Sequence, residues 1–136
     1  MSIRSSVRLV VHAVWSVQHR TAVLTQTHDA WLCDALARKA ESLGSAVLAA
    51  GVATDHVHVV LELPPTQSLA NVVGQMKGYA AFMWNRASPP RDNLTWQDGY
   101  WARSCEPEDL ARLLDYVTNQ RRRHGEAVSP GWEPNP

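Results

Sequence analysis

Two apolar runs near the middle of the chain constrain its fold more than any other feature of the sequence. The runs, residues 46–53 and 56–63, are separated by a Thr-Asp dipeptide and followed by two prolines. Short apolar runs between turn residues are typical of strands, and proline ends a strand because it cannot donate a backbone hydrogen bond. The pattern therefore predicts a β-hairpin of two neighbouring antiparallel strands.

Five further elements are indicated by hydrophobic periodicity and by capping residues. Thr27 and Ser68 can each cap the start of a helix, and Gly44 suits the end of the first one. Acidic residues in the first turn and arginines in the last indicate a final helix. In chain order we expect a strand at residues 7–17, a helix from 27 to 44, a helix from 68 to about 87, a strand with a bend at 94–104, and a helix from about 107 that ends just before Gly125.

The resulting order β-α-β-β-α-β-α predicts an α+β fold. We expect a ferredoxin-like, antiparallel four-stranded sheet with the helices packed on it. A chain of 136 residues has the usual length of one domain, so residues 1–136 are interpreted as a single domain with an irregular tail from about residue 126. This architecture supports many activities, and function therefore has to be argued from particular residues.

Charge and cysteine content exclude several classes of protein. The formal net charge is zero, which argues against coating of nucleic acid by bulk electrostatics and leaves local clusters, of which Arg121, Arg122 and Arg123 form the clearest. The two cysteines, Cys33 and Cys105, are far apart and indicate neither a disulfide framework nor a zinc knuckle. The apolar start of the chain is too short to span a bilayer. We therefore expect a cytoplasmic protein with no membrane partner.

The segment DHVHVV contains the first pattern with chemical content. His56 and His58 are two residues apart on an expected strand, so both imidazoles project from the same face and form half of a metal site. A chain with six histidines contains such a pair by chance in roughly one case in four, so two hydrogen-bonded structural histidines are an equal alternative. Glu62 falls on the same face and could orient a ligand, whereas Asp55 suits a turn equally well. His12, in the first strand, is expected at a hydrogen-bonded core or interface position.

The final helix adds a second pattern. Tyr116 and Gln120 are four residues apart, which places them on one helical face, one turn from each other. Arg112, Asn119 and Arg123 lie on the solvent side of Tyr116, where they could contact phosphate. The alternative is a boundary tyrosine with a half-packed ring and an amide bonded to water.

Together these motifs resemble those of the HUH single-tyrosine transposases, a family that includes insertion-sequence transposases and REP-associated tyrosine transposases. The similar features are the H-x-H pair on a strand, the aromatic segment WQDGYWARS and the Y-x-x-x-Q pattern on a late helix. The resemblance runs from RLVVHAVWSVQHR through DHVHVVLELPP and QMKGYAAF to YVTNQ. Each motif alone is weak, but the motifs in the family's order are together specific.

The resemblance implies a metal site and a nucleophile. His56, His58 and Gln120 would bind a divalent ion, Mg²⁺ or Mn²⁺, and Tyr116 would attack a phosphodiester. The substrate would be single-stranded DNA folded into hairpins at the ends of a mobile element. The resemblance also implies that the protein forms a homodimer. We expect the protein to act in the cytoplasm, at the nucleoid.

The chemistry of these residue types is consistent with the resemblance. A tyrosine phenol has an ordinary pKa of about 10, so at neutral pH it is almost entirely protonated and needs help to attack phosphorus. Two neutral imidazoles and one amide oxygen leave a divalent ion its full charge for the phosphate oxygens. Attack by tyrosine gives a 5′-phosphotyrosine and a free 3′-hydroxyl, from which strands can be rejoined. Lys77 and Arg103 are further candidates for DNA contact, with solvated surface cations as the alternative.

Two other functions stay open at the level of sequence. A domesticated descendant would bind hairpin DNA or RNA without cutting it, and the neutral net charge favours it slightly. A metal-dependent phosphodiesterase would use water as the nucleophile and would survive the loss of Tyr116. The joint presence of His56, His58, Tyr116 and Gln120 favours the transposase, since a binding module has no need of all four.

Overall fold

A computed structural model of the chain describes residues 6–87 and 92–124, the last two of them as backbone only. Its elements follow the expected order, with a short extra helix at the end. In chain order they are β1 (Leu9–Ser16), α1 (Asp29–Ser42), β2 (Ala46–Val52), β3 (His56–Leu63), α2 (Leu69–Asn85), β4 (Trp101–Ser104), α3 (Leu110–Thr118) and α4 (Gln120–His124). No helix within the described residues is long and apolar enough to cross a membrane. The expected irregular tail from about residue 126 lies outside the described residues.

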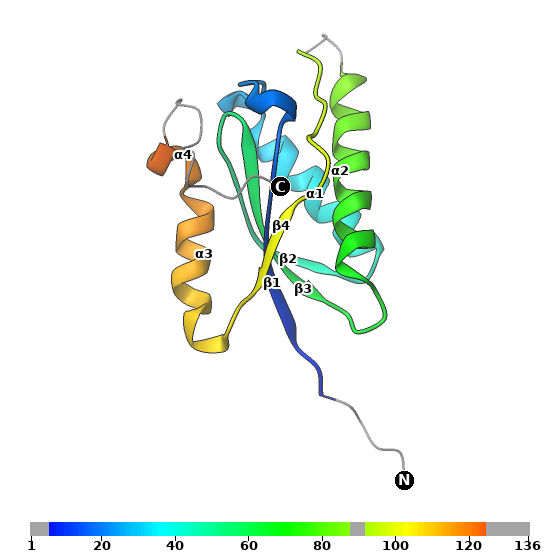
Figure 1. The fold of residues 1–136 in the computed structure, drawn as a ribbon, viewed down its shortest axis with the longest axis vertical. Coiled ribbons are helices and arrows are strands. Elements are labelled where there is room, and N and C mark those ends of the chain that lie inside the picture. Colours follow the sequence, from blue (N-terminus) through cyan, green and yellow to red (C-terminus); the bar gives the residue numbers. More distant parts are fainter. Residues whose placement is uncertain (1–5, 88–91, 125–136) are drawn as a thin grey trace.

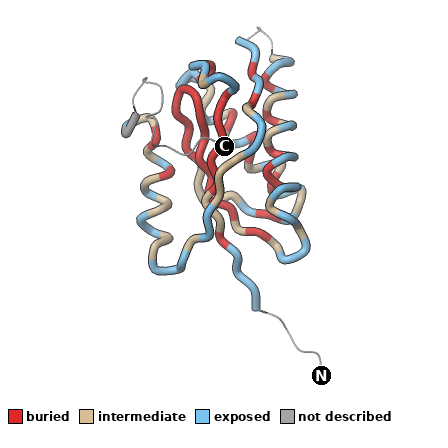
Figure 2. The backbone as a smooth tube through the Cα atoms, viewed as in Figure 1, coloured by how far each residue is buried: buried red, intermediate tan, exposed pale blue. Residues whose placement is uncertain are grey.

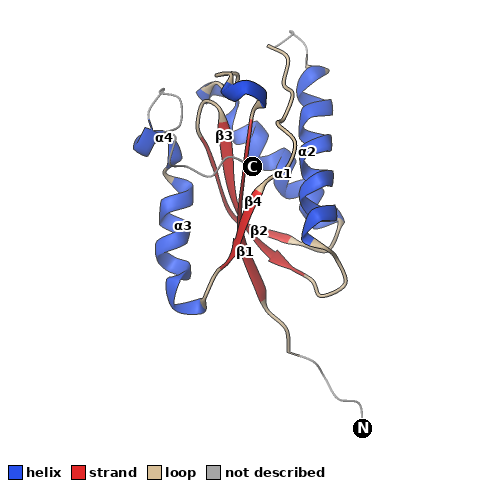
Figure 3. Cartoon of the chain, in the orientation of Figure 1, coloured by secondary structure: helices blue, strands red, loops and turns tan. Residues whose placement is uncertain are grey.

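The four strands form one antiparallel sheet in the order β2-β3-β1-β4. This is the split β-α-β arrangement of ferredoxin-like folds, in which β3 lies between β1 and β2. α1 and α2 cover one face of the sheet, and α3 and α4 lie against the other (Figure 1, Figure 3). The expected α+β fold is therefore confirmed, and the predicted hairpin is the pair β2 and β3.

Side chains of β3 alternate between the two faces of the sheet and so separate the core from a polar site. Val57, Val59 and Leu61 belong to the main hydrophobic core, which α1 and α2 cover. His56 and His58 project to the opposite face, and both are buried. Figure 2 shows the central strands as the buried part of the molecule, so the histidines sit between two packed layers and not on a solvated surface.

Gly51 on β2 allows α3 and α4 to approach the histidine strand. It pairs with His58 across the sheet. A Cβ atom at this position would lie 1.7 Å from the carbonyl oxygen of Val117 and 2.9 Å from Cγ of Gln120. Contacts that short are impossible for a real side chain, so glycine is required for this close approach.

The two long helices begin near their expected caps. The Oγ of Ser68 accepts a hydrogen bond from the backbone N–H of Asn71 at 3.0 Å, as predicted for an N-cap. The prediction that Thr27 caps α1 was wrong: a single 3₁₀ turn at Gln26–His28 precedes the helix and makes His28 the N-cap. Gly44 follows the end of α1 with a φ of 79°, a conformation that favours glycine.

The strand predicted at residues 94–104 is mostly absent. β4 holds only its last four residues, and the preceding segment touches the sheet through one bridge between Val17 and Trp96. Side chains of α2 bind the backbone of that segment instead. The amide of Asn85 both donates to and accepts from the backbone of Leu94, and the ammonium of Lys77 donates to two further carbonyls in the loop before β4. Side chains thus satisfy part of this backbone, while the N–H of Gln97 donates to the carbonyl of Ser16 in β1 at 2.9 Å.

The prediction of one continuous helix after residue 107 was also wrong. A 3₁₀ turn at Pro107–Asp109 leads into α3, and the backbone leaves helical geometry at Asn119, with φ −103° and ψ 33°, before α4 begins. Amide side chains bind carbonyls of the preceding turn: Asn119 donates to Asp115 at 2.8 Å and Gln120 donates to Tyr116 at 2.9 Å. Such side-chain bonds compete with helix continuation and change the chain direction at Asn119.

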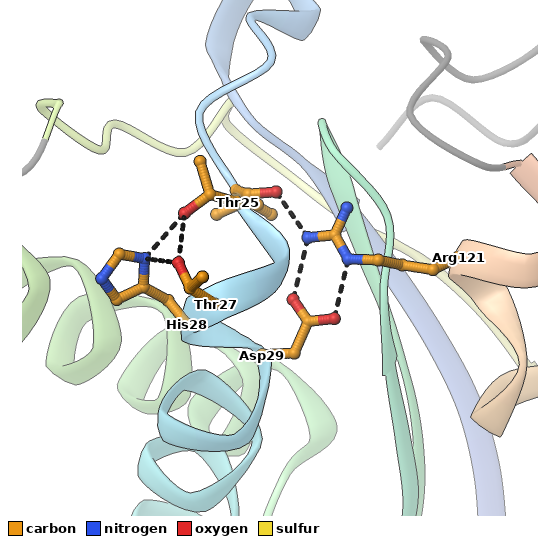
Figure 4. A network of polar contacts seen from close by, with 6 residues as sticks. Thr25, Thr27, His28, Asp29 and Arg121 are labelled. Atoms are coloured by element: carbon orange, nitrogen blue, oxygen red, sulfur yellow. Dashed lines mark hydrogen bonds and ion pairs between the residues drawn. The ribbon is translucent and has the colours of Figure 1, made fainter.

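Arg121 connects α4 to the start of α1 (Figure 4). Its guanidinium donates to both carboxylate oxygens of Asp29, at 2.7 and 2.8 Å, and to the carbonyl of Leu24 at 2.5 Å. Its side chain is only 12% exposed. The arginine cluster expected to bind nucleic acid is therefore divided: Arg121 is a structural tether, Arg122 is exposed, and the side chain of Arg123 lies outside the described residues.

We expect Gly51→Ala to lower the free energy of unfolding by about 1–3 kcal/mol, because the added methyl group forces α3 away from β2. Thermal unfolding followed by circular dichroism measures the effect. Gly74→Ala is the matched control: no heavy atom lies within 4 Å of its built Cβ, so removing a helical glycine should stabilise by about 0.5–1 kcal/mol. Equal melting temperatures for Gly51→Ala and the wild type would contradict the close approach.

Arg121→Ala should destabilise the protein by about 2 kcal/mol, the usual contribution of hydrogen bonds to a charged group. Arg122→Ala, a substitution of its exposed neighbour, should change stability by less than about 0.5 kcal/mol. Urea unfolding of both variants tests the difference. The tether is refuted if the two variants unfold at the same urea concentration.

Candidate active site

His56 is held by a buried carboxylate. Its Nδ1 lies 2.8 Å from Oδ1 of Asp55, and both side chains have no exposed surface. The other carboxylate oxygen of Asp55 faces Nη1 of Arg20 at 3.6 Å. A buried carboxylate is costly unless it is paired, and here it has a cation on one side and an imidazole on the other. Asp55 therefore fixes the ring of His56 and directs Nε2 away from the carboxylate.

His58 is held by a second histidine. Its Nδ1 lies 2.8 Å from Nε2 of His12, and the two rings are stacked with centroids 5.1 Å apart. One nitrogen must donate and the other accept, so the two tautomers are coupled. The expected hydrogen-bonded position of His12 is thereby observed. A ligand of His58 would have to bind through Nε2.

Tyr116 comes from α3 to lie over the histidines. Its ring is perpendicular to that of His58 at a centroid distance of 5.5 Å, and to that of His12 at 6.3 Å. The side chain is partly buried, which fits the boundary position inferred from the sequence. The ring of His56 lies 5.0 Å from that of His58, so three of the expected site residues lie close together in the fold of one chain.

Gln120 completes the group of expected site residues. Its Nε2 donates to the carbonyl of Tyr116, while Oε1 is buried and has no hydrogen-bond partner within the described part of the chain. A buried carbonyl oxygen without a partner is costly, and a cation is one group that would satisfy it. The donor set of two imidazoles and an amide oxygen therefore fits a divalent metal ion. Among the described residues, no cluster of three or more His, Cys, Asp or Glu side chains offers another candidate.

A pocket of about 510 Å³ opens beside Tyr116. We call it the tyrosine pocket. Residues from the end of β4, from α3 and from the turn between them form its walls together with His12. The lining residues include His12, Arg103, Cys105, Arg112, Leu113 and Tyr116.

The residues expected to contact DNA are distributed unevenly. Arg103 and Arg112 both line the tyrosine pocket; Arg103 stacks over the ring of Trp101 at 5.2 Å, and Arg112 pairs with Asp109 at 2.5 Å. Asn119 is partly buried and bonds to Asp115.

Lys77 lies apart from this group because it sits on α2 and anchors the loop before β4. Its ammonium donates to the carbonyls of Gln97 and Gly99 at 2.9 and 2.7 Å. Burial lowers the pKa of Lys77 below its ordinary value, and the nearby carboxylate of Asp98 opposes that shift.

Sequence reasoning understated Asp55 and His12 and overstated Glu62. Glu62 pairs with Arg8 at 3.4 Å and lies at the opposite end of β3 from His56, so it does not orient either histidine. Asp55 sits directly before the H-x-H pair, and this adjacency was the available signal for its role. His12 pairs across β1 and β3 near His58, a cross-strand contact that spacing along the chain does not reveal.

Two solved structures share the fold of this chain. A crystal structure of a protein from Deinococcus radiodurans described as a transposase matches with a TM-score of 0.66 at 20% identity, covering 95% of this chain and 98% of that one. A REP-associated tyrosine transposase bound to a REP hairpin has the same TM-score at 17% identity, with 93% of this chain and 76% of that chain covered. At these identities the likeness concerns the fold.

Curated relatives are transposases of insertion sequences. The ISDra2 transposase TnpA of Deinococcus radiodurans is 31% identical over 118 residues, which cover 83% of this chain and 84% of the relative. The IS200 transposase of Salmonella typhimurium is 27% identical over 97 residues, which cover 66% of this chain and 63% of the relative. The family model described as "Transposase IS200 like" matches residues 5–120. The chain therefore belongs to the IS200-like transposase family.

Proposed function

We propose that this chain is a single-stranded DNA transposase that cleaves and rejoins DNA at hairpin-bearing ends through a 5′-phosphotyrosine on Tyr116. The observation that carries the proposal is that the ring of Tyr116 lies 5.5 Å from that of His58, and that Gln120 lies against Gly51, the cross-strand partner of His58, beside an open pocket. A relative in the solved structures binds a REP hairpin, which supports hairpin DNA as the substrate class. Such a protein would work in the cytoplasm, at the nucleoid.

Tyr116 would carry the chemistry. Its hydroxyl oxygen forms a bond to phosphorus, the bond from phosphorus to the 3′ oxygen breaks, and the tyrosine proton is lost as the 3′-hydroxyl gains one. The number of phosphodiester bonds is unchanged, so a second 3′-hydroxyl can reverse the step and join strands. A hydrolytic phosphodiesterase could not rejoin strands, because water would break the phosphodiester without forming a phosphotyrosine in its place.

The residues that would hold a divalent ion, Mg²⁺ or Mn²⁺, are His56, His58 and Gln120. A bound ion would polarise the scissile phosphate and neutralise charge on its oxygens. Asp55 and His12 would orient the two imidazoles. Asp55 is hydrogen-bonded to Nδ1 of His56 and His12 to Nδ1 of His58, which leaves the Nε2 atom of each ring to bind the ion.

DNA would approach from the side of the tyrosine pocket. Arg103 and Arg112 line that pocket and are the proposed DNA contacts on this side of the molecule. Asn119 and Arg123 remain proposed contacts near the break after α3. Lys77 remains one only for a strand that reaches the loop before β4. A homodimer would place two such sites on the two ends of an element.

Tyr116→Phe should abolish covalent protein–DNA adducts and strand cleavage, because it removes only the attacking oxygen. Binding of hairpin DNA should stay within a few fold of the wild type. A denaturing gel with end-labelled single-stranded hairpin DNA from the region flanking the gene measures both. Tyr79→Phe is the matched control, since Tyr79 lies on α2 and should leave adduct formation unchanged. Cleavage by Tyr116→Phe would favour the water-using phosphodiesterase, and binding without cleavage by the wild type would favour the domesticated protein.

Loss of metal ligands should be visible without DNA. His56→Ala and Gln120→Ala should each remove Mn²⁺ binding in a calorimetric titration and reduce metal-dependent cleavage severely. Asp55→Asn should weaken Mn²⁺ binding by about 10- to 100-fold, the usual effect of losing an orienting partner. His28→Ala, at the start of α1, is the control that should bind as the wild type does. Unchanged Mn²⁺ affinity in both ligand variants would refute the site.

A further inference from the structure

The tyrosine pocket has the size of a small-molecule site. Its volume of about 510 Å³ falls within the range of roughly 300–1,000 Å³ found for ligand pockets. Tyr116 and His12 line it together with residues from the end of β4 and from α3. Anything bound in it would lie next to the proposed nucleophile, so its occupant belongs to the DNA that the tyrosine would attack.

The charges in the pocket disfavour a phosphate group as the occupant. Glu106, Asp109 and Asp115 line it together with two arginines, and one of these, Arg112, is already paired with Asp109. Burial is the largest cause that raises the pKa of the Cys105 thiol, and the nearby carboxylates of Asp109, Glu106 and Glu108 raise it further. A phosphate would be repelled, whereas a neutral ring with amino groups would find acceptors.

The pocket also offers a flat stacking group. The Arg103 guanidinium lies over the ring of Trp101 at 5.2 Å, and Trp101 meets the edge of His12 at 5.1 Å. A guanidinium ordered in this way presents a planar face on which a base can stack. Leu113 and Cys105 add apolar surface to the pocket. Flat, apolar and acceptor-rich surroundings together suit an unstacked nucleobase.

We infer that the tyrosine pocket binds one unstacked nucleobase of the nucleotide that adjoins the phosphodiester attacked by Tyr116. The base carries an exocyclic amino group, as in cytosine, adenine or guanine, which donates to the pocket carboxylates. Thymine, which lacks that group, is disfavoured. This inference rests on the proposed function, and it adds selection of the cleavage position by the protein itself.

An abasic scan tests the inference. A labelled hairpin oligonucleotide on which the wild type forms an adduct is resynthesised with one abasic nucleotide at each position in turn. Its affinity for the Tyr116→Phe protein is measured by fluorescence anisotropy. We expect one position, next to the mapped adduct, where loss of the base weakens binding about tenfold, as for a stacked base. Thymine at that position should cost about as much as the abasic nucleotide.

Variants assign that position to the pocket. In the Tyr116→Phe background, Cys105→Trp fills the pocket and should reduce the abasic penalty to less than about twofold, while Cys105→Ser, of nearly equal size, should retain it. Arg103→Ala removes the stacking group and should reduce the abasic penalty in the same way. Arg103 is exposed, so this substitution should not destabilise the fold. Arg38→Ala, exposed on α1, should leave the penalty unchanged.

Two outcomes would overturn the inference. One is the absence of any penalty next to the adduct; the other is a penalty that persists in both Cys105→Trp and Arg103→Ala. Adduct formation by the wild type is measured separately on the unmodified hairpin. An adduct without a base penalty would therefore refute base binding in the pocket and leave the proposed function standing. The absence of any adduct would refute the proposed function itself.

Discussion

The docking of α3 and α4 against β2 is the contact on which the candidate site depends. Gly51, which pairs with His58 across the sheet, has no side chain and so leaves room for the main chain at Val117. Beyond the break at Asn119, the bidentate pair between Arg121 and Asp29 holds the next segment against the start of α1. Tyr116 and Gln120 flank this contact, so their placement beside the histidines follows from packing and not from the Y-x-x-x-Q spacing alone.

The buried polar side chains of the candidate site are each held by a hydrogen bond through one of their nitrogen atoms. Asp55 holds Nδ1 of His56, and His12 holds Nδ1 of His58. Gln120 donates its amide N–H to the carbonyl of Tyr116 and keeps Oε1 buried. These bonds offset part of the cost of burying imidazoles and an amide. They also fix the orientation of the two imidazoles and the amide, as the proposed binding of a metal ion would require.

Local patterns predicted most of the fold and half of the site. The alternation in β3 was enough to place His56 and His58 on one face, and the order of elements was enough to give the sheet. The predicted length of β4 was too great because side chains of α2 bind the segment before it, and this contact joins distant parts of the chain. The break at Asn119 interrupts a periodicity that continues in the sequence. Arg121 looked like a DNA contact because its partner, Asp29, lies 92 residues away.

Covalent attachment of DNA to Tyr116 is the step on which the proposed function depends. Its most direct test is mass spectrometry of the protein after reaction with single-stranded hairpin DNA, nuclease trimming and proteolysis. We expect a nucleotide joined through its 5′-phosphate to the peptide that contains Tyr116, and no modified Tyr79 or Tyr100. Cleaved DNA without a nucleotide-bearing peptide, or a nucleotide on another residue, would contradict it.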